Sequence, residues 1–343
     1  MKSIKLTLDR TIYWIVLSVI GLAYVAFLSN MPNEWFRDRY YYVIYASFSD
    51  QIIDAYKEQS ILALFFNEPI FLYFNYYLEK VFDPEFIPHI FVGFITSVFF
   101  IFLGRNSRNF LIFIPGLFLC LIMPYVLQGE LVAIRQGFAT SVFILSFFIL
   151  KDDKKILAVL FLCSLFHSVF FIFTVFYFLN FFVLKSFSFN KKLVVHFFVM
   201  LAFASIAVLA AKFFGLRQGE GYEKIEDLGV GGGAFLVFLI VFIYLYFFGN
   251  RENRKMYEFA MMGLVMFLTS YFISPIAGRL FNTVIPFVIF LLVSRSRAID
   301  FVMIFFLIMV FLFLFINGSY TDLFAIPVSP EEFRNYWKSL ISL

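Results

Sequence analysis

The sequence predicts an all-α polytopic membrane protein, and three observations support this prediction. Of the 343 residues, 62% are hydrophobic and only 15% are charged. The mean hydropathy is +0.91, so a soluble fold of this length would lack the polar residues needed to cover its surface. The apolar residues form runs of about 15 to 20, close to the roughly 20 residues with which a helix crosses a bilayer core.

Short basic segments separate the apolar runs and set the predicted orientation. Lys2, Lys5 and Arg10 precede the first run. Later basic turns lie at residues 105–108, 151–155, 185–192, 251–255 and 295–297. Because lysine and arginine accumulate on the cytoplasmic side of membrane proteins, we expect the N-terminus and these turns to be cytoplasmic. The first run ends without a small-residue cleavage site, so residues 11–29 are expected to be a retained span.

About nine full spans are predicted between these turns, in a single integral membrane domain. They are placed at residues 11–29, 86–104, 110–128, 134–150, 193–213, 234–249, 256–274, 280–294 and 299–317. Together with a hairpin of two short helices, this gives about 11 helices in total.

Two other apolar segments cannot be simple crossings. Residues 30–85 must lie outside, since the next basic turn comes only at residue 105, and we expect partly inserted helices there. Residues 156–184 have basic residues on both flanks and must leave the cytoplasm and return. At 1.5 Å per residue each arm reaches only about 20 Å. The segment therefore predicts a hairpin of two short helices that meet near His167, where broken backbone requires contact with protein or a water-filled cavity.

Two further segments are expected outside. Residues 214–233 form a predicted external loop, whose glycines are more typical of a flexible loop than of a phosphate-binding nest. Residues 318–343 form a predicted external amphipathic tail. In this tail Ser329 and Pro330, followed by two glutamates, are typical of a helix start.

Arginines near the outer starts of two spans are candidates for binding an anion. Arg135 is followed by Gln136 and small residues, and a helix start with a guanidinium suits a negatively charged ligand. Arg279 lies at the start of another predicted span. The alternative for both is an interfacial arginine that extends to water. Arg135 could also pair with Glu130.

His167 and two external stretches complete the candidate residues. A histidine at the hairpin apex could act in catalysis, or be a neutral core residue bonded to a backbone carbonyl. Aromatic side chains beside charged groups suit sugar binding, and the alternative is an ordinary solvated loop with interfacial tyrosines. The residues singled out in these stretches are Asp38, Tyr41, Glu68, Arg217 and Tyr222.

Several functions are disfavoured by what the sequence lacks. Cys120 and Cys163 both lie in apolar runs, and no Cys/His spacing fits zinc, so neither a disulfide framework nor a metal site is expected. No cofactor is predicted. The net charge of +4 gives no case for nucleic acid in a membrane chain. The predicted spans carry no carboxylates at their centres, which disfavours ion transport.

The order of these elements resembles the EpsG/Wzy-type polysaccharide polymerases of bacterial envelopes. The resemblance rests on the Asp/Tyr-rich first external loop, Glu68-Pro69, Arg135-Gln136-Gly-Phe-Ala139, Phe166-His167-Ser168 and the late Arg279. It implies a C-type glycosyltransferase or ligase-like fold in the bacterial inner membrane, with the active site facing the periplasm. It also implies that no metal or other cofactor is used.

The resemblance implies that undecaprenyl-pyrophosphate-linked repeat units are joined into O-antigen or a related surface polysaccharide, with the lipid pyrophosphate as leaving group. Arg135 and Arg279 would hold the pyrophosphate. His167 would be a base or a hydrogen-bond donor, with Glu68 or Asp38 as the alternative base. Implied partners are the lipid-linked glycans, membrane lipids and a chain-length regulator protein.

Two other functions stay open at this stage. An O-antigen ligase would use the same donor but transfer glycan to the lipid A core. A flippase or transporter of lipid-linked oligosaccharides would need no transfer chemistry. The clustering of polar residues on one side and the lack of paired repeats disfavour the transporter.

Overall fold

The computed structural model describes residues 2–213, 232–274, 276–318, 323 and 329–341. All regular elements within these residues are helical, which confirms the all-α prediction for them. They are α1 (Lys2–Ser29), η1 (Asn33–Trp35), α2 (Arg39–Ser47), α3 (Ser49–Gln59), α4 (Ile61–Phe66), α5 (Pro69–Glu79), η2 (Pro84–Phe86), α6 (Ile87–Asn106), α7 (Phe110–Ile122), α8 (Pro124–Leu127), η3 (Gln128–Val132), α9 (Ile134–Ile149), α10 (Asp153–Ser164), α11 (Phe170–Phe178), η4 (Leu179–Val183), α12 (Phe189–Phe213), α14 (Gly233–Phe248), α15 (Arg254–Ser270), α16 (Ile276–Leu292), α17 (Ala298–Ile316) and α18 (Pro330–Ile341).

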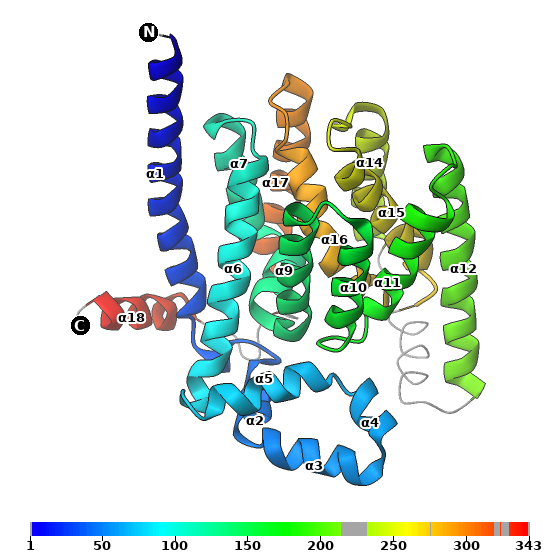
Figure 1. Cartoon of the computed structure of the whole chain (residues 1–343). Helices are drawn as coiled ribbons and strands as arrows, with labels where there is room; N and C mark the ends of the chain where they lie inside the picture. Colours follow the sequence, from blue (N-terminus) through cyan, green and yellow to red (C-terminus); the bar gives the residue numbers. More distant parts are fainter. Residues whose placement is uncertain (1, 214–231, 275, 319–322, 324–328, 342–343) are drawn as a thin grey trace.

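The long helices stand side by side as an upright bundle (Figure 1). Helix α1 forms one edge of the bundle and α12 the other, while α2 to α5 run across its lower end. Helix α18 projects sideways near the lower end of α1. Its N-terminus is capped as the sequence predicts, since the Glu332 N–H donates to Ser329 Oγ at 3.1 Å and the Ser329 N–H to the Glu332 carboxylate at 2.8 Å.

Within the described residues, four helices are long and apolar enough to cross a membrane. These segments are Thr11–Ser29, Pro84–Asn106, Phe189–Leu209 and Ala298–Ile316. Shorter apolar helices occupy Ile134–Ile149, Phe170–Val183, Gly233–Phe248 and Ile276–Leu292. A helical membrane protein is therefore supported, and the count of nine full spans stays a prediction.

The predicted span at residues 110–128 is not one straight helix. Phe110–Ile122 and Pro124–Val132 meet at an angle of 70°. Pro124 favours this break, because a residue before proline is driven out of the helical region. Met123 accordingly has an extended backbone, with φ −89° and ψ 115°. Beyond the break, the Tyr125 ring packs against Phe238 and Phe281 at centroid distances of 5.4 and 5.0 Å.

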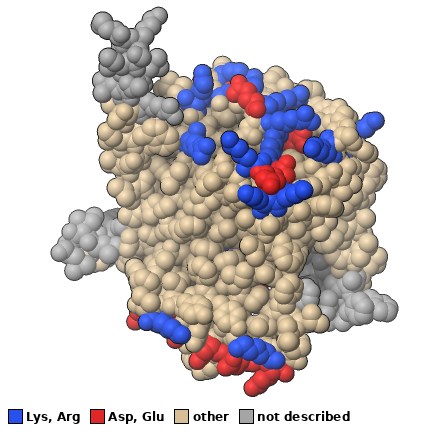
Figure 2. Space-filling model, viewed as in Figure 1, with Lys and Arg blue, Asp and Glu red and all other residues tan. Residues whose placement is uncertain are grey.

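The predicted basic turns gather at one end of the bundle, here called the basic end (Figure 2). Contacts between the turns hold this end together. The Arg108 N–H donates to the Val293 carbonyl at 3.1 Å. Arg295 donates to the Asn250 side chain at 3.1 Å. Segments that the sequence predicts to share one side of the membrane therefore lie next to one another.

Candidate functional site

An ion pair between Glu68 and Arg135 lies at the centre of the candidate site. Glu68 occupies the junction of α4 and α5, and Arg135 the first turn of α9. Arg135 Nη1 donates to Glu68 Oε2 at 2.5 Å. The other carboxylate oxygen accepts the Ser168 N–H at 3.1 Å. Glu68 thus joins three segments that are far apart in sequence, including the α10–α11 turn that carries His167.

The backbone of Glu68 is in the left-handed region, with φ 59° and ψ 53°. It is the one non-glycine residue with positive φ in the described part of the chain. A side chain with a Cβ pays about 1–2 kcal/mol for this conformation. Pro69 follows at the first position of α5, where its fixed φ suits a helix start. The sharp junction points the Glu68 carboxylate at both α9 and the α10–α11 turn.

Aromatic rings surround the Arg135 guanidinium. Its centre lies 5.2 Å from the ring centroid of Tyr45 and 5.7 Å from that of Tyr42. Phe71 adds a third ring at 5.8 Å. Arg135 Nε is buried without a hydrogen-bond partner, although the side chain as a whole keeps 30% of its exposure. The guanidinium is therefore held in place, and the Arg135 side chain is partly exposed.

The three consecutive tyrosines of α2 divide between this site and the surface. Tyr42 is buried, whereas Tyr41 is 60% exposed and packs edge-on against Tyr40. Burial raises the pKa of the Tyr42 phenol, and the nearby Arg135 charge acts in the opposite direction. Asp38 is exposed at the start of α2 and lies close enough to affect Tyr42 electrostatically. Tyr41, a candidate for sugar binding, therefore lies at the surface, and Tyr42 contacts Arg135.

Gln136 connects the two helices that carry the candidate arginines. Its side-chain amide donates to the Arg279 backbone carbonyl and to Thr283 Oγ1, the latter at 2.9 Å. Gln136 is 2% exposed, so this connection between α9 and α16 is buried. Arg279 itself is exposed, and it forms no ion pair with any residue that the structure describes.

His167 lies in the break between α10 and α11, within electrostatic reach of both Arg135 and Arg279. Its Nδ1 accepts the Val169 N–H at 3.4 Å, and no bond to a backbone carbonyl is found among the described residues. The structure therefore brings Glu68, Arg135, Gln136, His167 and Arg279 together. Arg217 and Tyr222 lie outside the described residues.

Glu130 is a buried carboxyl group, and the sequence analysis does not predict its burial. It is 3% exposed, and its Oε2 accepts a hydrogen bond from the Tyr24 hydroxyl at 2.7 Å. A pairing of Arg135 with Glu130 is therefore wrong. Glu258 of α15 and Asp300 of α17 are buried as well, but each lies near the start of its helix and not at the centre of a predicted span. The sequence contains one indication of this buried group. Gln128, Gly129 and Glu130 follow Pro124 within an apolar stretch, a pattern that indicates a helix break with a polar side chain.

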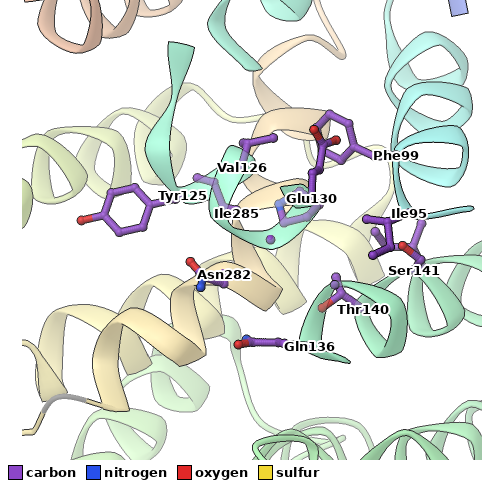
Figure 3. A pocket seen from close by; sticks show the side chains of 14 residues that line it. Ile95, Phe99, Tyr125, Val126, Glu130, Gln136, Thr140, Ser141, Asn282 and Ile285 are labelled. Atoms are coloured by element: carbon purple, nitrogen blue, oxygen red, sulfur yellow. The ribbon is translucent and has the colours of Figure 1, made fainter. Parts of the chain in front are cut away.

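Glu130 and Gln136 line one small cavity beside the helix break (Figure 3). Its volume is about 20 Å³, enough for a single water molecule. Figure 3 shows the Glu130 side chain pointing toward Phe99 and away from Asn282. Thr140 closes the cavity between α9 and α16 and lies 3.4 Å from Thr283 Oγ1. The cavity is too small for a sugar.

One comparison with known proteins identifies a family. The model of a protein family described as the EpsG family matches residues 5–329. This range includes every residue of the site described above. No curated protein sequence and no solved structure matches the chain significantly.

Proposed function

The chain belongs to the EpsG family, and from this premise we propose that it joins lipid-pyrophosphate-linked oligosaccharide repeat units into a bacterial surface polysaccharide. The family suggests a polysaccharide polymerase-type function. The proposal adds the donor, an undecaprenyl-pyrophosphate-linked glycan, and the product, O-antigen or a related polymer. It also places the protein in the inner membrane, with the basic end in the cytoplasm and the Arg135 site toward the periplasm.

The observation that carries the proposal is the fixed but accessible guanidinium of Arg135, with Arg279 on the neighbouring helix. Two arginines can donate directed hydrogen bonds to the oxygens of a pyrophosphate. Their contribution grows as the anomeric C–O bond breaks and negative charge moves onto the leaving group. The tyrosine rings beside Arg135 provide apolar faces suited to a sugar.

The reaction is a group transfer in which one bond replaces another. A hydroxyl oxygen of the acceptor glycan attacks the anomeric carbon of the donor glycan, and the bond from that carbon to the pyrophosphate breaks. The lipid pyrophosphate leaves with the bonding electrons, and the hydroxyl proton passes to a base. Both Glu68 oxygens are already engaged, by Arg135 and by the Ser168 N–H. Glu68 is therefore assigned to positioning Arg135.

Two groups remain as the base, His167 and Asp38. His167 Nδ1 accepts the Val169 N–H at 3.4 Å, so a neutral imidazole carries its proton on Nε2. His167 is then better suited to donate a hydrogen bond to the phosphate than to accept a proton. Asp38 is an exposed carboxylate at the edge of the site. His167→Gln and Asp38→Asn, compared in one polymerisation assay, separate these roles, because loss of the base lowers the rate most at high pH, where the base is unprotonated in the unchanged protein.

The central test replaces Arg135 in a strain that lacks the native gene. Arg135→Ala is expected to abolish long polysaccharide chains, and Arg135→Lys to reduce them strongly, because an ammonium group cannot replace the planar fork. Arg105→Lys, a matched change at the basic end, should leave the chain-length ladder normal. Normal long chains from a well-expressed Arg135→Ala variant would refute the site. A deletion strain with bare lipid A core would indicate a ligase, and a core bearing one repeat a polymerase.

A further inference from the structure

A cleft opens at the basic end, on the side of the bundle away from the Arg135 site. It lies between the ends of α10, η4, α12 and α15 and has a volume of about 320 Å³. Its lining, here called the basic cleft, consists of Asp153, Phe181, Lys185, Lys192, Arg254, Lys255 and Glu258.

The basic cleft contains more positive than negative charge. Glu258 is held by Lys192 at 2.7 Å and by Arg254 at 2.7 Å. Asp153 is held by Lys255 at 2.5 Å. Lys185 is exposed and forms no ion pair with any described residue. The four cations and two carboxylates of the lining leave an excess of two positive charges.

Membrane orientation alone does not explain this arrangement. Exposed lysines such as Lys155 already satisfy the preference for positive charge on the cytoplasmic side. Lys192, in contrast, is 4% exposed, and burying its charge carries a desolvation penalty. Asn180 donates to Glu258 at 3.3 Å and helps to hold the pair. The cleft is therefore a built site with fixed walls.

An aromatic floor completes the cleft. The Lys192 and Lys255 amines lie 5.8 and 5.9 Å from the centroid of the Phe181 ring. Phe181 and Asn180 both belong to η4, a π-helical turn, which is a feature frequent at functional sites. The turn directs one polar and one aromatic side chain into the same space. Cations above an apolar floor match a phosphate group joined to an organic moiety.

We propose that the basic cleft binds a phosphate group, remote from the Arg135 site and independent of the transfer reaction. The shared chemistry is a phosphate monoanion or dianion facing Lys185, Arg254 and Lys255. It can be supplied by the headgroup of an anionic lipid, because basic pockets between helix ends at this side of a membrane suit such headgroups. A soluble phosphate compound offers the same group.

Binding to the purified full-length protein tests this proposal. In one arm the protein is placed in phosphatidylcholine nanodiscs that either contain or lack phosphatidylglycerol. Native mass spectrometry then measures how much phosphatidylglycerol the released protein retains. The other arm titrates inorganic phosphate and follows the shift in melting temperature. Lys185→Gln and Arg254→Gln remove exposed cations of the cleft. Lys155→Gln removes an exposed cation from α10 outside the cleft and serves as the matched control.

Each cleft variant is expected to weaken binding about fivefold, the factor that corresponds to roughly 1 kcal/mol per basic residue near a membrane surface. The control should match the unchanged protein. Loss in the nanodisc arm assigns the group to a lipid, and loss in the phosphate arm to a soluble compound. The proposal is overturned if Lys155→Gln weakens binding as much as the cleft variants do, or if neither probe binds.

Discussion

Arg135 donates to the Glu68 carboxylate at 2.5 Å and thereby joins residues that are 67 positions apart in the chain. The contact orients a guanidinium that three aromatic rings already surround. A ligand phosphate would meet a positioned donor and would not have to order a flexible one. Pre-ordering of this kind is how electrostatic groups contribute most to a transition state.

Two substitutions of Glu68 distinguish the effect of its charge from the effect of its left-handed backbone. Glu68→Gln keeps the shape but removes the negative charge, and polymer synthesis should fall about 10- to 100-fold, as expected for loss of a charged hydrogen bond. Glu68→Gly also removes the carboxylate but relieves the left-handed backbone, which should recover about 1 kcal/mol of stability relative to Glu68→Gln. Glycan ladders and thermal unfolding in detergent measure the two effects. Full activity of Glu68→Gly would contradict the assigned role.

The contact between α9 and η3, just beyond the helix break, leaves no space for an added methyl group on Gly137. A Cβ on Gly137 would lie 2.0 Å from the Gly129 carbonyl oxygen, and a backbone atom cannot move aside cheaply. Gly137→Ala is expected to destabilise the protein by about 1–3 kcal/mol, the usual range for overpacking. Gly278→Ala is the matched control, because a Cβ there meets nothing within 4 Å. Equal melting temperatures for the two variants would argue against the packed break.

The Tyr24–Glu130 hydrogen bond can be measured by a double-mutant cycle. Tyr24→Phe removes the donor and leaves a buried carboxyl group without a partner, at a cost of about 1–3 kcal/mol. Glu130→Met removes the acceptor and leaves the buried Tyr24 hydroxyl without this partner, at a similar cost. The double variant should be less destabilised than the sum of the two, and the difference is the coupling energy. Strict additivity in equilibrium unfolding would show that the two side chains do not interact.

The buried pair of Lys192 and Glu258 should respond asymmetrically to mutation. Lys192→Met removes one cation but leaves Glu258 with Arg254, so the loss should stay below about 3 kcal/mol, the lower end for a broken buried pair. Glu258→Gln leaves both Lys192 and Arg254 without their counter-charge and should cost more. Thermal unfolding of the two variants decides the order. The reverse order would mean that Arg254 does not compensate.

The sequence predicts most of the fold because apolar runs and basic turns are local signals. Helices cover the predicted ranges, and the basic turns meet at one end. The break at Met123 escapes prediction for a physical reason. Prolines within apolar helices are common in membranes, and Pro115 lies inside α7 without ending it. Only the packing of Tyr125 against α14 and α16 shows why the chain turns at Pro124.

The sequence singles out candidate residues but does not predict which of them contact one another. Arg135, Gln136 and Arg279 stand out because they lie at the ends of apolar runs opposite to the basic turns. The partner of Arg135 depends on tertiary contacts, and Glu130 is much closer in sequence than Glu68. Which tyrosine of α2 contacts Arg135 depends on how the helix is rotated about its axis. Three consecutive tyrosines do not specify that rotation.

The break at Met123 has a consequence for the order in which the protein assembles. Helix α7 contains 13 residues and rises about 20 Å, less than the thickness of a bilayer core. The open backbone at its end needs protein around it. The aromatic residues that cover the break, Phe238 and Phe281, belong to α14 and α16. When α7 leaves the ribosome these helices have not yet been synthesised, so the break after α7 cannot reach its final packing until α14 and α16 have entered the membrane.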